Sequence, residues 1–343
     1  MSIRKIAEIT GLSTATVSHV INNTRVVSKK NRDLVNKTII ETGYKPNMAA
    51  KALRTQRFHT VAMLMPTVEP GMSTNLYFIE VMSGAKDVME MNGYNLIVST
   101  YLDSSISHNN DVELHVKQLN VLQRLWVDGV ILVPNKVSYK KVLENIGDSL
   151  PLVLVDRDIP EKNYSCVSSD HVQASFNATD LLIRNNKKRI AYIGGPEDSF
   201  TGHDRYEGYV KALAANTLPL DPSLVQMIRP YTVEEGYKSA AKVIEAGADS
   251  LFVANHVLTI GVMKYLQEKR IDVPEQVSVI TFEDYEWMQA MHPPITSIRQ
   301  NPYVIGRLAA EILLKRIKNP EYSEHVVLDA EIVIRKSHGN INE

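Results

Sequence analysis

The chain has 343 residues, of which 44% are apolar, and its formal net charge is −1. This length allows two or three globular domains, and no apolar run reaches the roughly 20 residues that span a membrane. The N-terminal stretch MSIRKIAEIT lacks the apolar core and cleavage site of a secretory signal, so we expect a cytoplasmic protein without membrane partners. The single cysteine, Cys166, excludes an internal disulfide framework and a cysteine-based metal site.

The small net charge conceals an uneven distribution. Residues 1–59 contain 11 Lys and Arg against three Asp and Glu, a balance of +8 that leaves −9 for the rest of the chain. A basic first sixth on an acidic remainder is typical of a nucleic-acid-binding head joined to a body with another task. A solvated charged tail is the alternative, but a tail would lack the apolar periodicity of this region.

Three short helices are predicted in the basic region. The first covers 3–10, where apolar residues recur at helical spacing, and Gly11 ends it. Ser13 is a suitable N-cap for the second helix, and Ser28 for a third that ends at Gly43. The residues expected to pack these two helices onto the first are Val17, Val20, Ile21, Leu34, Val35, Thr38 and Ile39.

Two short helices around a glycine turn describe a helix-turn-helix, whose second helix enters the DNA major groove through its N-terminal residues. The faces of the second helix that do not pack on the head contain short polar residues and one alanine. Together with the residue before the helix they are Ser13, Thr14, Ala15, Thr16, Ser18, His19 and Asn22. Short helical hairpins also occur in ordinary protein cores, so it is the +8 charge of the region that favours double-stranded DNA as the partner.

From Thr60 onward, predicted strands alternate with amphipathic helices in two series. The first has strands at 60–65, 94–100, 128–133 and 150–156 and helices at 76–91, 109–125 and 138–146. The second has strands at 189–195, 225–230, 250–255 and 277–283 and helices at 204–215, 233–246 and 257–269, followed by a strand at 295–300 and a helix at 302–317. Repeated β-α-β units predict an α/β fold with parallel doubly wound sheets covered by helices on both faces.

The two series suggest two sheet subdomains joined by several crossing strands. We therefore expect a helix-turn-helix head at 1–46, a hinge helix and linker at 47–59 and a body at 60–343. Within the body, the N-subdomain is expected at about 60–160 plus 293–322, and the C-subdomain at about 161–292 plus 323–338.

Ligands of doubly wound sheets bind beyond the carboxyl ends of the strands. The polar and aromatic residues expected there, as an effector-binding set, are Asn75, Tyr77, Phe78, Asp156, Asp170, Thr201, Arg205, Asn255 and Glu283. Carboxylates, an amide and a guanidinium bind hydroxyl groups and an aromatic face stacks on a ring, so the set suits a small polyhydroxylated or heterocyclic molecule. Two plainer readings stay open: Asp156 and Asp170 could cap helices, and Tyr77 and Phe78 could belong to the core.

Two motifs, STATVSHVIN and TGYKPNMAAKALRTQ, resemble the head and hinge of the LacI/GalR-type transcriptional repressors, in the family's order and spacing. Within the family, the head is most similar to the purine and ribose repressors. The resemblance implies that Thr14, Ala15, Thr16, His19 and Arg25 lie near base edges, which agrees with the chemistry of hydroxyl, methyl and guanidinium groups. Most relatives have Arg where this chain has His19, and a histidine that contacts only phosphate is an equally good interpretation.

The second motif implies a short hinge helix over Pro46–Leu53. Small residues such as Ala50 would let two copies, one from each protomer, lie side by side in the minor groove, with Leu53 as an apolar wedge that opens a base step. Asn47, Lys51 and Arg54 complete the expected DNA-binding set. Without DNA the segment is too short to persist as a helix in water and would be an alanine-rich linker.

The resemblance extends to about Lys336 and implies a periplasmic-binding-protein-like body, in which Arg205 of TGHDRYEGYVKAL would clamp the effector. Two positions depart from the family pattern. His256 stands where relatives usually have Asp, and Glu283 ends a Thr-Phe-Glu that is usually Gly-Phe-Asp. Ser199 also stands where the purine repressor has a base-contacting arginine. We therefore favour a sugar or sugar phosphate as effector, with a purine- or nucleoside-responsive, co-repressed regulator as the alternative.

The family further implies a homodimer in which each protomer reads one half of a near-palindromic operator. Only 338–343 follow the last predicted strand, too few residues for the leucine-heptad tail of tetrameric relatives. Ligand-induced closure of the body would change DNA affinity through the hinge helices, as induction or as co-repression.

An enzyme is the rival class, because doubly wound folds host many enzymes. The sequence lacks a P-loop, since Gly194-Gly195-Pro196 does not continue to a GKS/T ending, and it lacks G-x-G-x-x-G, G-x-S-x-G and H-E-x-x-H patterns. A transporter's sugar-binding component would require export and would have no use for the basic head. We therefore expect a regulator rather than an enzyme, with no cofactor and no metal.

Overall fold

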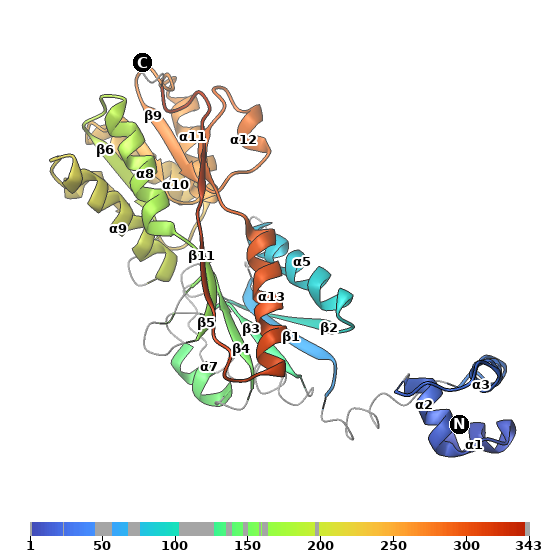
Figure 1. The fold of residues 1–343 in the computed structure, drawn as a ribbon. Coiled ribbons are helices and arrows are strands. Elements are labelled where there is room, and N and C mark those ends of the chain that lie inside the picture. The colour runs from blue at the N-terminus through green and yellow to red at the C-terminus, as the bar shows by residue number, and fades with distance from the viewer. Residues whose placement is uncertain are drawn as a thin grey trace. The chain divides into compact units, whose positions relative to one another are not determined.

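The fold of the chain is given by a computed structural model (Figure 1). It describes residues 2–22, 24–44, 57–67, 76–102, 127–134, 139–146, 150–157, 159, 164–195 and 199–339. By their internal contacts these residues form two units, a head at Met1–Phe58 and a body at His59–Glu343. In the described part of the chain, no helix has the length and apolar character needed to cross a bilayer.

The head contains the three predicted helices, α1 (Ile3–Thr10), α2 (Thr14–Asn22) and α3 (Lys29–Thr42). Their ends follow the predicted capping residues. The Ser13 hydroxyl accepts the Thr16 backbone N–H at 3.1 Å, and the Ser28 hydroxyl accepts that of Asn31 at 3.4 Å. Gly11 and Gly43 end α1 and α3 with φ of 67° and 60°, a left-handed conformation that glycine adopts without strain.

The core of the head is small. Its buried apolar residues are Ile6, Ala7, Val17, Val35 and Tyr44, with Val20, Ile21 and Ile39 packed at the edge. Thr38 is also buried, so most of the predicted packing residues are confirmed. Leu34 is the exception, because its side chain is 39% exposed. It lies about 100° around α3 from Val35, and the stripe of α3 that faces the other helices is centred on Val35 and Thr38.

The first sheet of the body has six strands in the order β11-β5-β4-β3-β1-β2, all paired in parallel. They are β1 (Thr60–Thr67), β2 (Asn95–Leu102), β3 (Gly129–Leu132), β4 (Leu152–Val155), β5 (Ser165–Ser169) and β11 (His325–Leu328). Helices α5 (Leu76–Met91) and α13 (Pro302–Lys318) pack on one face, and α7 (Tyr139–Ile146) packs on the other. The central strands β3 and β4 are buried throughout, as continuous apolar runs such as GVIL and LVLV require.

The second sheet has the order β12-β10-β9-β8-β6-β7, with only β12 antiparallel among its strands. They are β6 (Ile190–Gly194), β7 (Val225–Met227), β8 (Ser250–Val253), β9 (Ser278–Phe282), β10 (Thr296–Arg299) and β12 (Glu331–Val333). Helices α8 (His171–Arg184) and α9 (Phe200–Ala215) cover one face, and α10 (Val233–Glu245) and α11 (His256–Glu268) cover the other. Two short elements, η1 (Pro222–Leu224) and α12 (Trp287–Ala290), lie in connecting segments. The predicted α/β architecture with two parallel doubly wound sheets is confirmed.

Glycine allows the helices of a pair to approach closely. A Cβ at Gly208 of α9 would lie 2.3 Å from the carbonyl oxygen of Val172 in α8, and one at Gly306 of α13 would lie 1.8 Å from that of Val81 in α5. Both distances are far shorter than a van der Waals contact. Since the atoms met are backbone carbonyl oxygens, which cannot move aside as a side chain can, only glycine fits at these two positions. These close contacts fix α9 against α8 and α13 against α5.

The chain crosses between the two sheets after β5, after β10 and between β11 and β12 (Figure 1). The subdomain boundaries expected from the sequence differ at these crossings. Strands β5 and β11 lie in the first sheet although 161–292 and 323–338 were assigned to the second, and β10 lies in the second sheet although 293–322 was assigned to the first. Local patterns identify a strand, but pairing with a distant neighbour decides its sheet. The helix predicted at 109–125 lies outside the described residues. Helix α8 was not predicted from the sequence.

Candidate DNA-reading helix and effector cleft

The start of α2 presents the residues expected to read DNA. Ser13, Thr14 and Ala15 are exposed, as is Arg25 in the following loop, while Thr16, Ser18, His19 and Asn22 are half-buried. Part of this set is engaged within the head. The Asn22 amide donates to the Ser18 carbonyl at 2.9 Å, and His19 Nδ1 lies 2.8 Å from the Thr24 hydroxyl. The first turn of α2 is therefore the part most available to a partner.

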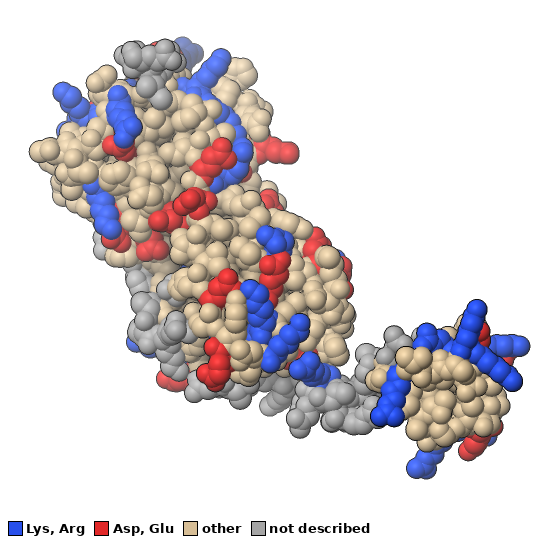
Figure 2. Space-filling view, viewed as in Figure 1, with Lys and Arg blue, Asp and Glu red and all other residues tan. Residues whose placement is uncertain are grey.

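The head is basic on its surface as well as in its sequence. Eight exposed Lys and Arg occur in its described part, namely Arg4, Lys5, Arg25, Lys29, Lys30, Arg32, Lys37 and Arg57. Two of them form ion pairs within a helix, Lys5 with Glu8 at 3.0 Å and Lys37 with Glu41 at 3.8 Å. On the visible face of the head blue side chains predominate, whereas red and blue mix on the body (Figure 2). Such a surface attracts phosphate groups.

Some predicted residues cannot be placed. Asn47, Ala50, Lys51, Leu53 and Arg54 of the expected hinge, and Asn75 of the expected effector set, lie outside the described residues. The hinge helix and the domain boundary at 46–47 therefore remain predictions.

The body contains a polar cavity of about 50 Å³ between its two sheets. Its walls are Tyr77, Phe78, Asp156, Arg157, Thr201, Arg205, Tyr231, Asn255, Glu283 and Gln300. Seven of the nine residues expected from the sequence meet here, from both sheets. The exception among the described ones is Asp170, whose carboxylate caps α8 by accepting the Gln173 N–H at 2.8 Å. The interpretation of Asp170 as a helix cap is therefore the correct one. Its backbone N–H donates to the Leu328 carbonyl and so joins two of the segments that cross between the sheets.

Three lining residues were missed. Gln300 follows β10 as Asp156 follows β4, and Arg157 follows Asp156 directly, so the strand-end rule should have included both. Tyr231 lies between β7 and α10, and nothing in its local sequence marks it as a cleft residue.

Asp156 organises the wall that belongs to the first sheet. It accepts the Tyr77 hydroxyl at 2.8 Å, and its oxygens lie 3.5 Å from His171 Nε2 and 3.5 Å from Arg157 Nε. Burial raises the pKa of Asp156, but the hydrogen bond and charge of His171, followed by the charge of Arg157, outweigh it and hold the pKa well below the usual 3.8. Burial and then the Asp156 charge raise the pKa of Tyr77, which therefore stays a donor.

Arg205 organises the opposite wall. Its Nη1 donates to the Ala254 carbonyl at 2.7 Å and its Nε to His171 Nδ1 at 3.4 Å. The guanidinium carbon lies 3.8 Å from the centre of the Phe282 ring, within cation–π range. Since Arg205 is only 8% exposed, its orientation is fixed. Among the described residues Nη2 has no acceptor, which leaves one donor for a ligand.

Glu283 completes this wall and is bonded to His256. His256 Nδ1 and Glu283 Oε2 form a short hydrogen bond, and both side chains are about nine-tenths buried. Burial raises the pKa of Glu283, but the charge and hydrogen bond of His256 and the charge of Arg205 lower it below its ordinary value. Asn255 caps α11 with its carbonyl oxygen, accepting the N–H groups of Val257 at 2.9 Å and Leu258 at 3.3 Å. Its amide nitrogen is thus oriented by the cap.

The two cleft carboxylates occupy matching places in the two sheets. Asp156 follows β4 and Glu283 follows β9, and each of these strands is third in its sheet order. Both residues have left-handed backbones, with φ of 68° and 72°, which is uncommon for residues other than glycine and is often found at functional sites. Each carboxylate also meets a histidine that begins a helix, His171 of α8 and His256 of α11.

A second polar cavity, of about 210 Å³, adjoins the cleft at the crossing after β10. We name it the crossover cavity, and its walls are Tyr77, Glu80, Glu283, Asp284, Tyr285, Arg299, Gln300 and Pro302. Asp284 is bound there by Ser297 at 2.5 Å, Arg299 at 2.6 Å and Arg335 at 2.6 Å, and this fixes the loop that follows Glu283.

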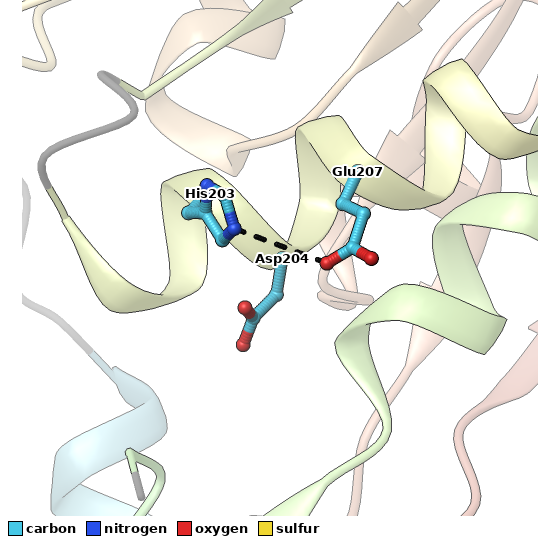
Figure 3. A group of neighbouring side chains, drawn as sticks. All are labelled: His203, Asp204 and Glu207. Carbon is cyan, nitrogen blue, oxygen red and sulfur yellow. Dashed lines mark ion pairs between the residues drawn. The ribbon is translucent and has the colours of Figure 1, made fainter. Parts of the chain in front are cut away.

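His203, Asp204 and Glu207 bring potential metal-ligand atoms within 4.8 Å of one another on α9 (Figure 3). Glu207 is already bound by Lys211 at 2.7 Å, and His203 lies 3.9 Å from Glu207 across one helical turn. These are ion pairs between neighbouring turns of a helix, and they already engage two of the three potential ligands, His203 and Glu207.

A helix-turn-helix head on a body with a polar cleft between two parallel sheets defines the class of a ligand-binding DNA regulator. Family comparison agrees with both parts. Residues 2–47 match the bacterial regulatory proteins, lacI family, and residues 179–338 match the periplasmic binding protein-like domain.

Relatives match over the whole length. The chain is 32% identical to the HTH-type transcriptional regulator RegA of Clostridium saccharobutylicum and 30% identical to the HTH-type transcriptional repressor PurR of Haemophilus influenzae, in each case over 98% of both chains. Its fold is similar to that of the lac repressor dimer bound to operator and the anti-inducer ONPF, with a TM-score of 0.84, 21% identity and 99% of each chain covered. The chain therefore belongs to the lacI family of bacterial regulatory proteins, and it is a transcriptional repressor, not an enzyme.

Proposed function

We propose that this repressor binds a near-palindromic operator in the cytoplasm as a homodimer, and that a small molecule in the cleft changes its DNA affinity through the segment 47–59. The observation that carries the proposal is the convergence of residues from both sheets, among them Tyr77, Asp156, Arg205 and Glu283, around one cavity in a chain that also has a basic helix-turn-helix head. Two sites in one chain are what allosteric control requires.

The chemistry of the cleft favours a sugar or sugar phosphate as effector. Glu283 and Asp156 supply acceptors, the oriented Asn255 amide and Arg205 Nη2 supply donors, and Phe78 supplies an aromatic face. Alternating donors and acceptors beside a ring face suit hydroxyl groups on a carbon ring.

A purine or nucleoside co-repressor is the second candidate, because a relative with 30% identity bears the name PurR. At position 199, where the purine repressor has a base-contacting arginine, this chain has a serine that offers less to a base. Ser199 is buried and its hydroxyl is occupied as the N-cap of α9, where it accepts the Gly202 N–H at 3.0 Å.

The volume of the cleft supports a coupling between effector and conformation. A cavity of about 50 Å³ holds water molecules, whereas ligand pockets are usually about 300 Å³ or more. An effector of sugar size would need more room than this cavity offers, so its binding would be accompanied by a movement of the two sheets relative to each other. The three crossings between the sheets would absorb such a movement, which would alter the surfaces that a second protomer contacts.

The first sheet offers apolar surface for a second protomer. On α5, Leu76 is 45%, Ile79 37% and Met91 87% exposed, and Val98 of the adjacent strand β2 is 36% exposed. Exposed apolar side chains on two neighbouring elements support a protein interface in this part of the body.

The proposal is tested by selecting binding sites from random duplex DNA with the full-length protein, and by measuring the affinity of the selected site with and without candidate effectors. We expect a near-palindrome, a logarithm of affinity that falls steeply with the logarithm of salt concentration, and a change of affinity with at least one compound that also raises the melting temperature.

Leu53→Ala should weaken operator binding and leave effector binding intact. Sites without symmetry or a flat salt dependence would contradict the proposal.

A further inference from the structure

The two positions at which the cleft departs from the family pattern are in contact. His256 replaces one usual aspartate and Glu283 another, and the imidazole and the longer carboxylate form the short hydrogen bond described above. The Glu283 side chain is one methylene longer than an aspartate. With this length its carboxylate reaches the imidazole of His256. The two substitutions therefore make one structural unit rather than two independent changes.

The neighbours of His256 hold its imidazole in the position in which it bonds Glu283. The Tyr285 ring packs edge-on against the imidazole with 4.6 Å between ring centres, and Asn255 fixes the start of α11, where His256 is the first residue. With Oε2 of Glu283 bound to Nδ1 of His256, Oε1 is the oxygen left for a ligand. Glu283 lines both the cleft and the crossover cavity, so its carboxylate belongs to the wall that the two cavities share.

The charges around this wall leave no positive excess. In the cleft, Arg157 and Arg205 stand against Asp156 and Glu283. In the crossover cavity, Arg299 is bound to Asp284, and Glu80 adds a further negative charge. A phosphate group placed here would face the Glu283 carboxylate, and Arg205 is the one lining cation without a carboxylate partner among the described residues, whereas a hydroxyl group would donate to Glu283 directly.

We propose that His256 is the positioning residue for Glu283, and that together they select an uncharged polyhydroxylated effector and exclude its phosphorylated counterpart. The inference rests on the proposed function and narrows its effector class. It assigns to His256 a role in recognition without contact to the effector, since the imidazole acts through the carboxylate that it holds.

The test is isothermal titration calorimetry of the full-length protein with D-glucose, D-ribose, cellobiose, glucose 6-phosphate, ribose 5-phosphate and hypoxanthine. The wild type should bind at least one neutral sugar, and it should bind the corresponding phosphate at least 100-fold more weakly. Glu283→Gln should lose at least tenfold in affinity for the sugar and should also discriminate less between sugar and phosphate, because the repelling charge is gone.

Variants of His256 separate positioning from general damage. His256→Ala should lose at least tenfold for the neutral sugar, and His256→Gln, which keeps a donor, should recover most of that loss. The double variant His256→Ala/Glu283→Gln should bind no more weakly than Glu283→Gln alone, since paired residues act non-additively. His203→Ala, an exposed histidine on α9, is the matched control and should bind as the wild type does; melting curves verify that each variant folds.

Binding of a sugar phosphate more tightly than of the sugar, unchanged discrimination in Glu283→Gln, or full affinity in His256→Ala would each overturn the inference. If hypoxanthine or a sugar phosphate changes operator affinity, the proposed function stands and the inference fails. If none of the probes binds or changes operator affinity, both fail.

Discussion

The first turn of α2 and the cleft of the body both contain polar side chains, but in opposite states of exposure. At the start of α2, Ser13, Thr14 and Ala15 are exposed, and few of their polar groups are engaged. In the cleft, Asp156 and Arg205 are buried and bound to Tyr77, to His171 and to backbone. An exposed polar group without a protein partner is solvated by water, but a buried one must find a partner inside the protein.

The difference follows from the sizes of the partners. A DNA duplex is large and is met by a surface that needs no rearrangement to be reached. A small effector has to replace contacts that the cleft residues make with one another, so its binding is tied to a change in the body. The contrast predicts that substitutions in the head affect DNA binding and the stability of the head, whereas substitutions in the cleft affect effector binding and the stability of the body.

The largest effect is expected from Val17→Asp. Val17 is fully buried in the small core of the head, and an unpaired carboxylate there unfolds a unit with little stability to spare. Operator affinity should fall by about 10³-fold or more, to the level of non-specific binding, as measured by fluorescence anisotropy, while the body melts as before. The control is Ile40→Asp, at a position on α3 that is 81% exposed, which should keep the head folded.

Arg205→Ala should abolish the effector response and keep operator binding. The substitution removes a buried guanidinium bound to the Ala254 carbonyl and to His171, and it leaves Glu283 with less opposing charge. A loss of about 2 kcal/mol or more, a factor of about 30, is expected in effector affinity, measured by titration of the full-length protein. Lys211→Ala, on the exposed face of the same helix, should bind normally. Normal titration of Arg205→Ala would remove this residue from the site.

Acid should destabilise the body through Asp156. Its pKa is lowered in the folded state, so its contribution is complete above the unfolded value near 3.8 and is lost as the pH falls toward the folded value. The unfolding free energy of the wild type should therefore lose about 1 kcal/mol relative to Asp156→Asn between pH 6 and pH 3. Denaturant titrations of both proteins at several pH values measure this difference. Parallel pH profiles would show that Asp156 gains no stabilisation from its partners.

The smallest effect is expected from Ser13→Ala. The hydroxyl caps α2 through the Thr16 N–H, and loss of such a cap costs about 1 kcal/mol. The head should melt a few degrees lower, and operator affinity should fall by less than tenfold if Ser13 acts only as a cap. A larger fall in affinity with an unchanged melting temperature would instead identify Ser13 as a DNA contact.

Much of this architecture could be predicted from the chain alone. Helices α1, α2 and α3, the serine caps of α2 and α3 and the glycine ends of α1 and α3 follow from periodicity and local backbone preference. The strand-end rule also selected most of the cleft, because a polar residue after a buried strand is visible in a sequence read in one dimension. The rule could not separate Asp156 from Asp170, since each directly follows a buried strand and only one turns its carboxylate to the cavity.

Sequence by itself therefore determined most of the elements, the basic head and the family, since these depend on local spacing, capping and composition. Tertiary structure alone decided three other matters: that β5, β10 and β11 each join the sheet opposite to the one expected, that Asp170 caps a helix, and that His256 holds Glu283. Each of these depends on which distant segments come together. That outcome is set by the burial of whole faces and the pairing of buried polar groups, and no short stretch of sequence contains it.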